Sequence, residues 1–201
     1  MSVSLPPHRC GPAPLKRRAL LCCLLGGMLC GSAAWAARSE PVELQHIEAR
    51  RADGAVSLSF ETRFDLPAGV EGALQHGVAL YFVADVQIER QRWFWFDKIL
   101  VETRRTWRLS YQPLTQNYRV SLGGLSQTHA TLSEALRAVQ RSRNWLVAEA
   151  LPSGLDDVPL VLNFSYRLDV GQLPRPMQLT ISSRPEWHLQ VDRSVDLPPV
   201  R

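Results

Sequence analysis

The chain has 201 residues, of which 23 are basic and 19 are acidic, giving a formal net charge of +4. Four basic residues, Arg9 and those at 16–18, precede position 37, and 23 minus 4 leaves 19 basic residues against 19 acidic ones. Residues 37–201 are therefore neutral, which argues against nucleic acid or an anionic membrane as the partner. All four cysteines also precede position 37, so the remaining residues offer no disulfide, thiolate nucleophile or cysteine metal ligand.

Residues 1–36 have the three-part pattern of a secretory signal peptide. Basic residues at 16–18 precede the apolar run 19–30, and small residues follow it. Ala34 and Ala36 fit the small-x-small cleavage rule, which predicts Ala37 as the new N-terminus. The apolar run is shorter than the ~20 residues of a membrane-spanning helix. We therefore expect general-route export to the periplasm or beyond, with no stable membrane span after cleavage. An uncleaved segment would instead anchor the protein in the inner membrane.

Alternation of apolar and polar side chains dominates residues 37–201 and predicts strands. The alternating runs cover 56–64, 78–88, 106–111, 117–122, 158–170, 177–181 and 187–191. One-sided alternation favours antiparallel sheets with one face on a core and one in water. We therefore predict a mainly β fold, an antiparallel β-sandwich of about eight to ten strands. Its core should span about 42–192 of a single domain, 37–201, and end in a flexible proline-containing tail, 193–201.

Two helices are expected between the strands. Residues 65–77 form a short helix, with Asp65 as a cap and Gly77 at its end. Thr131 and Glu134 form a capping box that begins an amphipathic helix over residues 131–141. Residues 123–129 should be a loop before this helix, and the two prolines in 173–176 predict a rigid extended connector between strands.

Several segments, in order and spacing, resemble the domain-of-unknown-function 4390 family of proteobacterial exported proteins. They are 77–82, 92–97, 107–115, 118–120, 132–136, 168–178 and Trp187. The resemblance covers roughly 42–192 and implies export, a single domain and no assigned activity. It supplies no catalytic residues. It also implies an envelope or inner-membrane protein as partner, with a membrane sensor kinase as a candidate, because relatives are often encoded near one.

The aromatic run at 92–97 is the main candidate for a binding surface. In a strand, Trp93 and Trp95 point to one side and the phenylalanines between them to the other. An exposed pair, rimmed by Arg92, Arg104 and Arg105, would form an aromatic–arginine surface for a protein partner. The alternative is a central strand that is buried on both faces.

No catalytic or metal-binding pattern emerges from the other polar residues. The histidines after position 37 are widely spaced and lack the spacing of a zinc site. Ser126 lies near His129, but turn formation explains that segment better than nucleophilic catalysis. We therefore expect no catalytic residues, no metal and no cofactor, and a non-enzymatic periplasmic or envelope interaction domain. Two alternatives remain: a hydrolase of an envelope polymer, with paired carboxylates beside Trp93 or Trp95, and a carrier of a hydrophobic ligand, with a cavity between the sheets.

Overall fold

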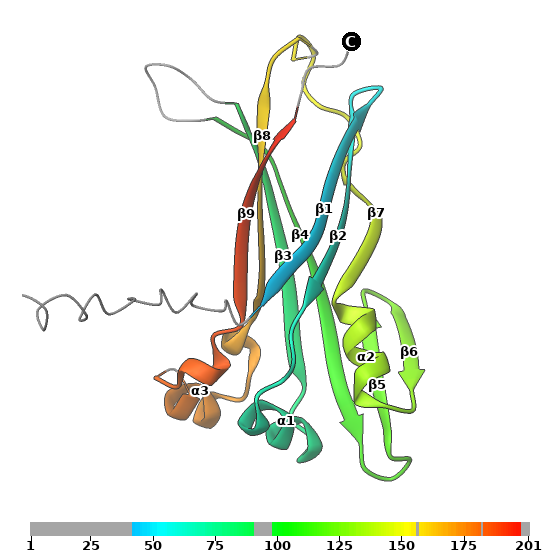
Figure 1. Cartoon of the computed structure of the whole chain (residues 1–201), viewed down its shortest axis with the longest axis vertical. Coiled ribbons are helices and arrows are strands. Elements are labelled where there is room, and N and C mark those ends of the chain that lie inside the picture. Colours follow the sequence, from blue (N-terminus) through cyan, green and yellow to red (C-terminus); the bar gives the residue numbers. More distant parts are fainter. Residues whose placement is uncertain (1–41, 91–97, 156, 182, 198–201) are drawn as a thin grey trace, which may run out of the picture. The chain divides into compact units, whose positions relative to one another are not determined.

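The computed structural model describes residues 42–90, 98–155, 157–181 and 183–197. In these residues nine strands form two antiparallel sheets (Figure 1), which confirms the predicted β-sandwich. The three-stranded sheet has the order β1-β2-β7 and contains β1 (Glu43–Ala52), β2 (Ala55–Arg63) and β7 (Arg141–Ala148). The six-stranded sheet has the order β6-β5-β4-β3-β8-β9. Its strands are β3 (Leu80–Arg90), β4 (Lys98–Gln112), β5 (Asn117–Leu122), β6 (Leu125–His129), β8 (Leu160–Leu168) and β9 (Gln190–Leu197).

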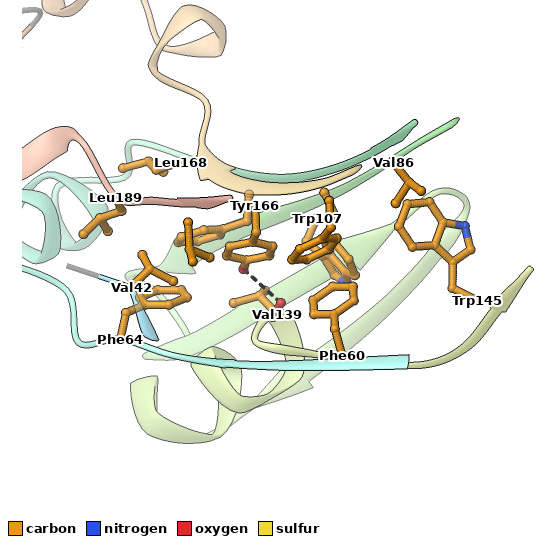
Figure 2. Packing of buried hydrophobic residues seen from close by; sticks show 14 of the residues in the cluster. Val42, Phe60, Phe64, Val86, Trp107, Val139, Trp145, Tyr166, Leu168 and Leu189 are labelled. Carbon is orange, nitrogen blue, oxygen red and sulfur yellow. Dashed lines mark hydrogen bonds between the residues drawn. The ribbon is translucent and has the colours of Figure 1, made fainter. Parts of the chain in front are cut away.

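The core lies between the inner faces of the two sheets. In β2 and β8 every second side chain is buried, as the alternation of the sequence predicts. Phe60 of the three-stranded sheet meets Trp107 edge-on (Figure 2), with ring centroids 6.0 Å apart. The centroid of the Phe164 ring lies 4.8 Å from that of Phe60. Such edge and tilted arrangements are the favoured ones for aromatic rings. The aromatic side chains therefore join the two sheets at the centre of the sandwich.

A buried hydrogen bond ties the six-stranded sheet to the helix α2 (Leu132–Val139). The hydroxyl of Tyr166 in β8 donates to the carbonyl oxygen of Val139 at 3.0 Å (Figure 2). Tyr166 is 1% exposed, so this bond satisfies a polar group that water cannot reach. The helix begins as its capping box predicts, because the Thr131 side chain accepts a hydrogen bond from the Glu134 N–H at 3.3 Å.

Two further helices cover one end of the sandwich, α1 (Ala68–Gln75) and α3 (Arg175–Ile181), as Figure 1 shows. The first matches the predicted short helix, although Pro67 and not Asp65 precedes its first residue. No helix in the described part of the chain is both long and apolar enough to cross a membrane.

Helix α3 corrects two expectations, the extended connector at 173–176 and the strand at 177–181. Pro176 sits in the first helical turn, where a missing N–H leaves no hydrogen bond unmade. The N–H of Met177 donates to the carbonyl of Pro174 at 2.9 Å and so starts the helix. Met177 and Ile181 share the helix face that packs on the core, while Leu179 is 85% exposed. The two-residue spacing of Met177, Leu179 and Ile181 suggests a strand. The four-residue spacing of Met177 and Ile181 instead places both on one face of a helix.

Two other expectations about the strands are also corrected. Residues 125–129 are strand β6 and not a loop, because Gly123, with φ of +57°, and Gly124 form a two-residue hairpin turn after β5. Strand β7 was not predicted. Strand β9 continues to Leu197, paired with Leu160, so residues 193–197 are not a flexible tail. Residues 198–201 lie outside the described part.

Candidate functional site

The structure describes two of the five residues predicted to form a binding surface. Arg92, Trp93 and Trp95 fall in 91–97, outside the described residues, as do the cleavage-site residues Ala34, Ala36 and Ala37. Arg104 and Arg105 both lie in β4, but on opposite faces of the sheet, because neighbouring side chains in a strand alternate. The structure therefore does not bring these two arginines together on one surface.

Arg104 belongs to an ion-pair network on the outer face of the six-stranded sheet. Its Nε donates to Oδ1 of Asp85 at 2.5 Å, and Nη1 of Arg167 donates to Oδ2 of the same carboxylate. The hydrogen bond to Asp85, together with its charge, raises the pKa of Arg104 above its usual value. The Asp85 side chain is 19% exposed. Both of its oxygens are engaged, so this carboxylate fixes two neighbouring strands to β3.

The network lines a polar hollow of about 420 Å³ on the outer face of the sheet. Carboxylates of Asp85, Glu102 and Asp192 line it, together with amides, hydroxyls and arginines. Strands β3, β4, β8 and β9 all contribute to it. The hollow is thus a mixed-charge surface in which the best-buried carboxylate is already paired.

Arg105 occupies a different environment on the inner face of β4. Its guanidinium carbon lies 4.7 Å from the centroid of the Trp145 ring, and Nη1 donates to Oγ of Ser142 at 2.9 Å. Burial lowers the pKa of Arg105, because the charged form loses hydration. Among the ion pairs of the described residues, none involves Arg105. The half-buried cation therefore has a ring and a hydroxyl as partners, but no carboxylate.

A bulge in β7 builds the support for Arg105. Leu58 of β2 pairs with Trp145 and Phe60 pairs with Ser142, so Arg143 and Asn144 both stand opposite Ser59. Asn144 has φ of +47°, and its N–H donates to Oγ of Ser59 at 3.0 Å. Ser142 and Trp145 are three residues apart and would face opposite sides of a regular strand. Because of the bulge, both point inward and are buried.

We call the hollow beside this arginine the Arg105 groove. It has a volume of about 220 Å³ and lies between the inner face of β4–β5–β6 on one side and α2 and β7 on the other. Its lining consists of Arg105, Trp107, Val120, Leu122, Leu125, Gln127, Ala138, Arg141, Ser142 and Arg143. Leu125 is 76% exposed although it is large and apolar. Arg141 is paired with Glu61 at 3.1 Å, so Arg105 and Arg143 supply the cationic character that no acidic side chain of the groove balances.

The weaker site candidates are separated by the structure. Ser126 lies on the outer face of β6, where its hydroxyl bonds to that of Ser121 at 2.8 Å. His129, three residues further along the same strand, faces the other side. In the described residues, no group of three or more histidine, cysteine, aspartate or glutamate side chains has the arrangement of a metal site.

The sequence reasoning named Arg105 but missed the side chains that hold it. Ser142 and Trp145 stand in a strand that was not predicted, because the bulge interrupts its alternation. The sequence signal for this bulge is Asn144, since asparagine adopts positive φ more readily than most residues.

Comparison with known proteins identifies one match. The family model described as Domain of unknown function (DUF4390) matches residues 39–195. No curated protein and no solved structure matches the chain. The family match therefore contains every strand of both sheets except the last two residues of β9, and it contains the whole Arg105 groove.

Proposed function

The chain belongs to the family Domain of unknown function (DUF4390), and from that premise we propose that it is an exported, non-enzymatic interaction domain of the cell envelope. Its partner is an envelope or inner-membrane protein that binds in the Arg105 groove. A membrane sensor kinase is one candidate, on the family resemblance given above. The observation that carries this proposal is the half-buried guanidinium of Arg105, which has no carboxylate partner among the described residues.

The environment of Arg105 favours binding of a carboxylate from outside the chain. Holding a partly dehydrated cation without an anionic partner is unfavourable, and a carboxylate would restore what burial removes. Trp145 and Ser142 already fix the orientation of the guanidinium, so less side-chain entropy is lost on binding. The exposed Leu125 supplies apolar contact area next to the charge. Arginine beside aromatic rings is the composition that binding hot spots favour.

The best-buried carboxylate of the outer-face hollow, Asp85, is poorly suited to act as a general base. A general base needs a carboxylate oxygen that can accept a proton from the reacting group. In the Asp85 carboxylate, both oxygens instead accept hydrogen bonds from arginines. The arrangement around Asp85 is that of a structural ion pair, whereas the half-buried guanidinium of the Arg105 groove has no carboxylate partner among the described residues.

Export is the part of the proposal that rests on residues 1–36. We expect the protein recovered from the periplasmic fraction to begin at Ala37, because Ala34 and Ala36 fit the signal peptidase rule. N-terminal sequencing of that fraction measures this directly. A periplasmic protein that begins at Met1 would contradict cleavage, and its absence from the periplasm would contradict export.

A site-specific crosslinking experiment tests the binding surface. A benzophenone side chain in place of Leu125 should yield a discrete crosslinked product in cells, because Leu125 is exposed at the mouth of the groove. The matched control carries the same group in place of Leu114, which is 100% exposed in the turn between β4 and β5. The product from position 125 should disappear when Arg105→Gln is added, and mass spectrometry would identify the partner.

Two results would count against the proposed surface. One is an identical crosslinking pattern from positions 114 and 125. The other is a product from position 125 that persists unchanged in the Arg105→Gln variant while that variant melts at the same temperature as the parent protein.

A further inference from the structure

Strand β4 has a long edge with no neighbouring strand. It pairs with β3 from Lys98 to Leu109, but with β5 only from Trp107 to Gln112. Residues 98–106 therefore have a strand on one side only, among the strands that the structure describes. An open edge of this length is a template for pairing with another chain, and proteins protect such edges unless they use them.

The inner face of the sheet is incompletely covered along this edge. Trp107 and Leu109 are buried where β5 flanks β4. Val101, Thr103 and Arg105 point to the same inner side but are only half-buried. Their partners on β3, at positions 84, 86 and 88, are all completely buried. The burial thus stops at β4, where one more strand would continue it.

The direction of the peptide groups at this edge follows from one hydrogen bond on the other side of β3. The N–H of Asp169 donates to the carbonyl of Tyr81 at 2.8 Å, one residue beyond the Phe82–Leu168 pair. That offset identifies Phe82–Leu168 as a pair that does not exchange hydrogen bonds directly. Odd-numbered residues of β3 therefore direct their peptide groups to β8, and even-numbered residues direct theirs to β4.

The open edge consequently presents a regular row of donors and acceptors. Even-numbered residues of β3 pair with Thr103 and Arg105 of β4. The peptide groups of Thr103 and Arg105 therefore point toward β3 within the plane of the sheet. The peptide groups of Glu102, Arg104 and Thr106 point away from β3. No backbone bond from these three residues to any other described segment exists outside the strand ladders. The row is therefore available to an added strand.

The charges around this edge select the partner. Arg105 lies on its inner side without a carboxylate, and Arg143 of β7 lies across the groove. Glu102 is the only acidic residue of β4, and it points to the outer face. The Cβ atom of a residue opposite Arg105 on the inner side of an added strand would lie about 4.5–5.5 Å from that of Arg105, which brings a glutamate carboxylate within reach of the guanidinium.

We propose that an extended acidic segment of the partner adds as a strand along β4 at Glu102–Thr106 and places an inward-facing carboxylate on Arg105. This inference rests on the proposed function, and it states how the partner binds. Main-chain hydrogen bonds to the open edge give affinity, and the side chains that face the groove give specificity. The carboxylate opposite Arg105 makes a charge-assisted bond in a half-buried position.

The test uses the protein purified from the periplasmic fraction and one synthetic peptide. Every second residue of this peptide is threonine. The residues between the threonines are valine, glutamate and valine in that order, so one face of the extended peptide carries the glutamate between two valines. Adding it should slow amide hydrogen exchange at Glu102, Arg104 and Thr106 by ~10-fold or more, as measured by NMR. The amides of Thr103 and Arg105 serve as controls, because they already bond to β3. A glutamine-for-glutamate peptide should bind at least ~10-fold more weakly.

Three outcomes would overturn the strand-addition inference. The first is binding near Arg105 without protection of the three edge amides, which would leave the Arg105 groove as a side-chain site and the proposed function intact. The second is no binding at millimolar peptide, in which case the crosslink from position 125 still decides the proposed function separately. The third is protection that appears without peptide and rises with protein concentration, which would make a second copy of this chain the occupant.

Discussion

Replacing Phe60 by alanine is expected to lower the free energy of unfolding by about 3–5 kcal/mol, which approaches the full stability of many domains of this size. Phe60 is 1% exposed, and its ring contacts those of Trp107 and Tyr166 (Figure 2) as well as that of Phe164. The three contacted rings all belong to the six-stranded sheet, so the substitution removes the main aromatic contact between the sheets. The loss combines the apolar area of the ring with the cavity that it leaves.

Urea unfolding followed by tryptophan fluorescence measures this change. The matched control is Leu114→Ala, a deletion of apolar atoms at a fully exposed position, which should change the free energy by less than about 0.5 kcal/mol. A Phe60→Ala variant with the stability of the parent would mean that the two sheets do not share one core.

Replacing Tyr166 by phenylalanine is expected to remove a pH-dependent part of the stability as well as a buried hydrogen bond. Burial raises the pKa of Tyr166 well above its usual value, because the phenolate would be dehydrated. In the unfolded chain a tyrosine titrates near pH ~10. The raised pKa stabilises the fold fully below that pH, and this contribution is lost as pH rises toward the folded pKa, at up to about 1.4 kcal/mol per pH unit.

Two measurements separate these effects. At neutral pH the Tyr166→Phe variant should be less stable by about 1–3 kcal/mol, because the Val139 carbonyl loses its donor in a buried position. Between pH 9 and pH 11 the parent protein should lose stability more steeply than the variant. Tyr81→Phe, which removes a hydroxyl from the opposite face of the six-stranded sheet, is the matched control for the measurement at neutral pH. Equal slopes for parent and Tyr166→Phe would show that Tyr166 ionises freely in the fold.

The elements that sequence reasoning predicted share one property, namely a pattern that is local and regular. In β8, alternation runs without interruption from Leu160 to Leu168, so the buried face is readable directly. In α2, Thr131 and Glu134 are cap residues whose roles do not depend on distant contacts. Helix α3 is different, since its apolar residues at two-residue spacing fit a strand equally well. Only the packing of Met177 and Ile181 on the core separates the two readings.

The candidate site was less predictable than the fold, for a different physical reason. Alternation alone separates Arg104 from Arg105, since adjacent residues of a strand face opposite sides. The partners of Arg105 could not be found in that way. Ser142 and Trp145 come to one side through a bulge, and their contact with β4 joins positions about 40 residues apart in the chain. Periodicity carries no information about such long-range contacts or about the edge that β4 leaves open.

The bulge at Asn144 makes this region sensitive to the backbone conformation of β7 as well as to the chemistry of its side chains. If β7 kept this three-residue spacing without the bulge, its pleat would be regular, and the indole of Trp145 would turn from the core to the solvent. Arg105 would then lose its aromatic support while every side chain that lines the groove was still encoded in the gene. Relatives of this protein are therefore better compared here by the residue at position 144 than by percentage identity, because a serine and a tryptophan three residues apart support the arginine only where the backbone between them can form the bulge.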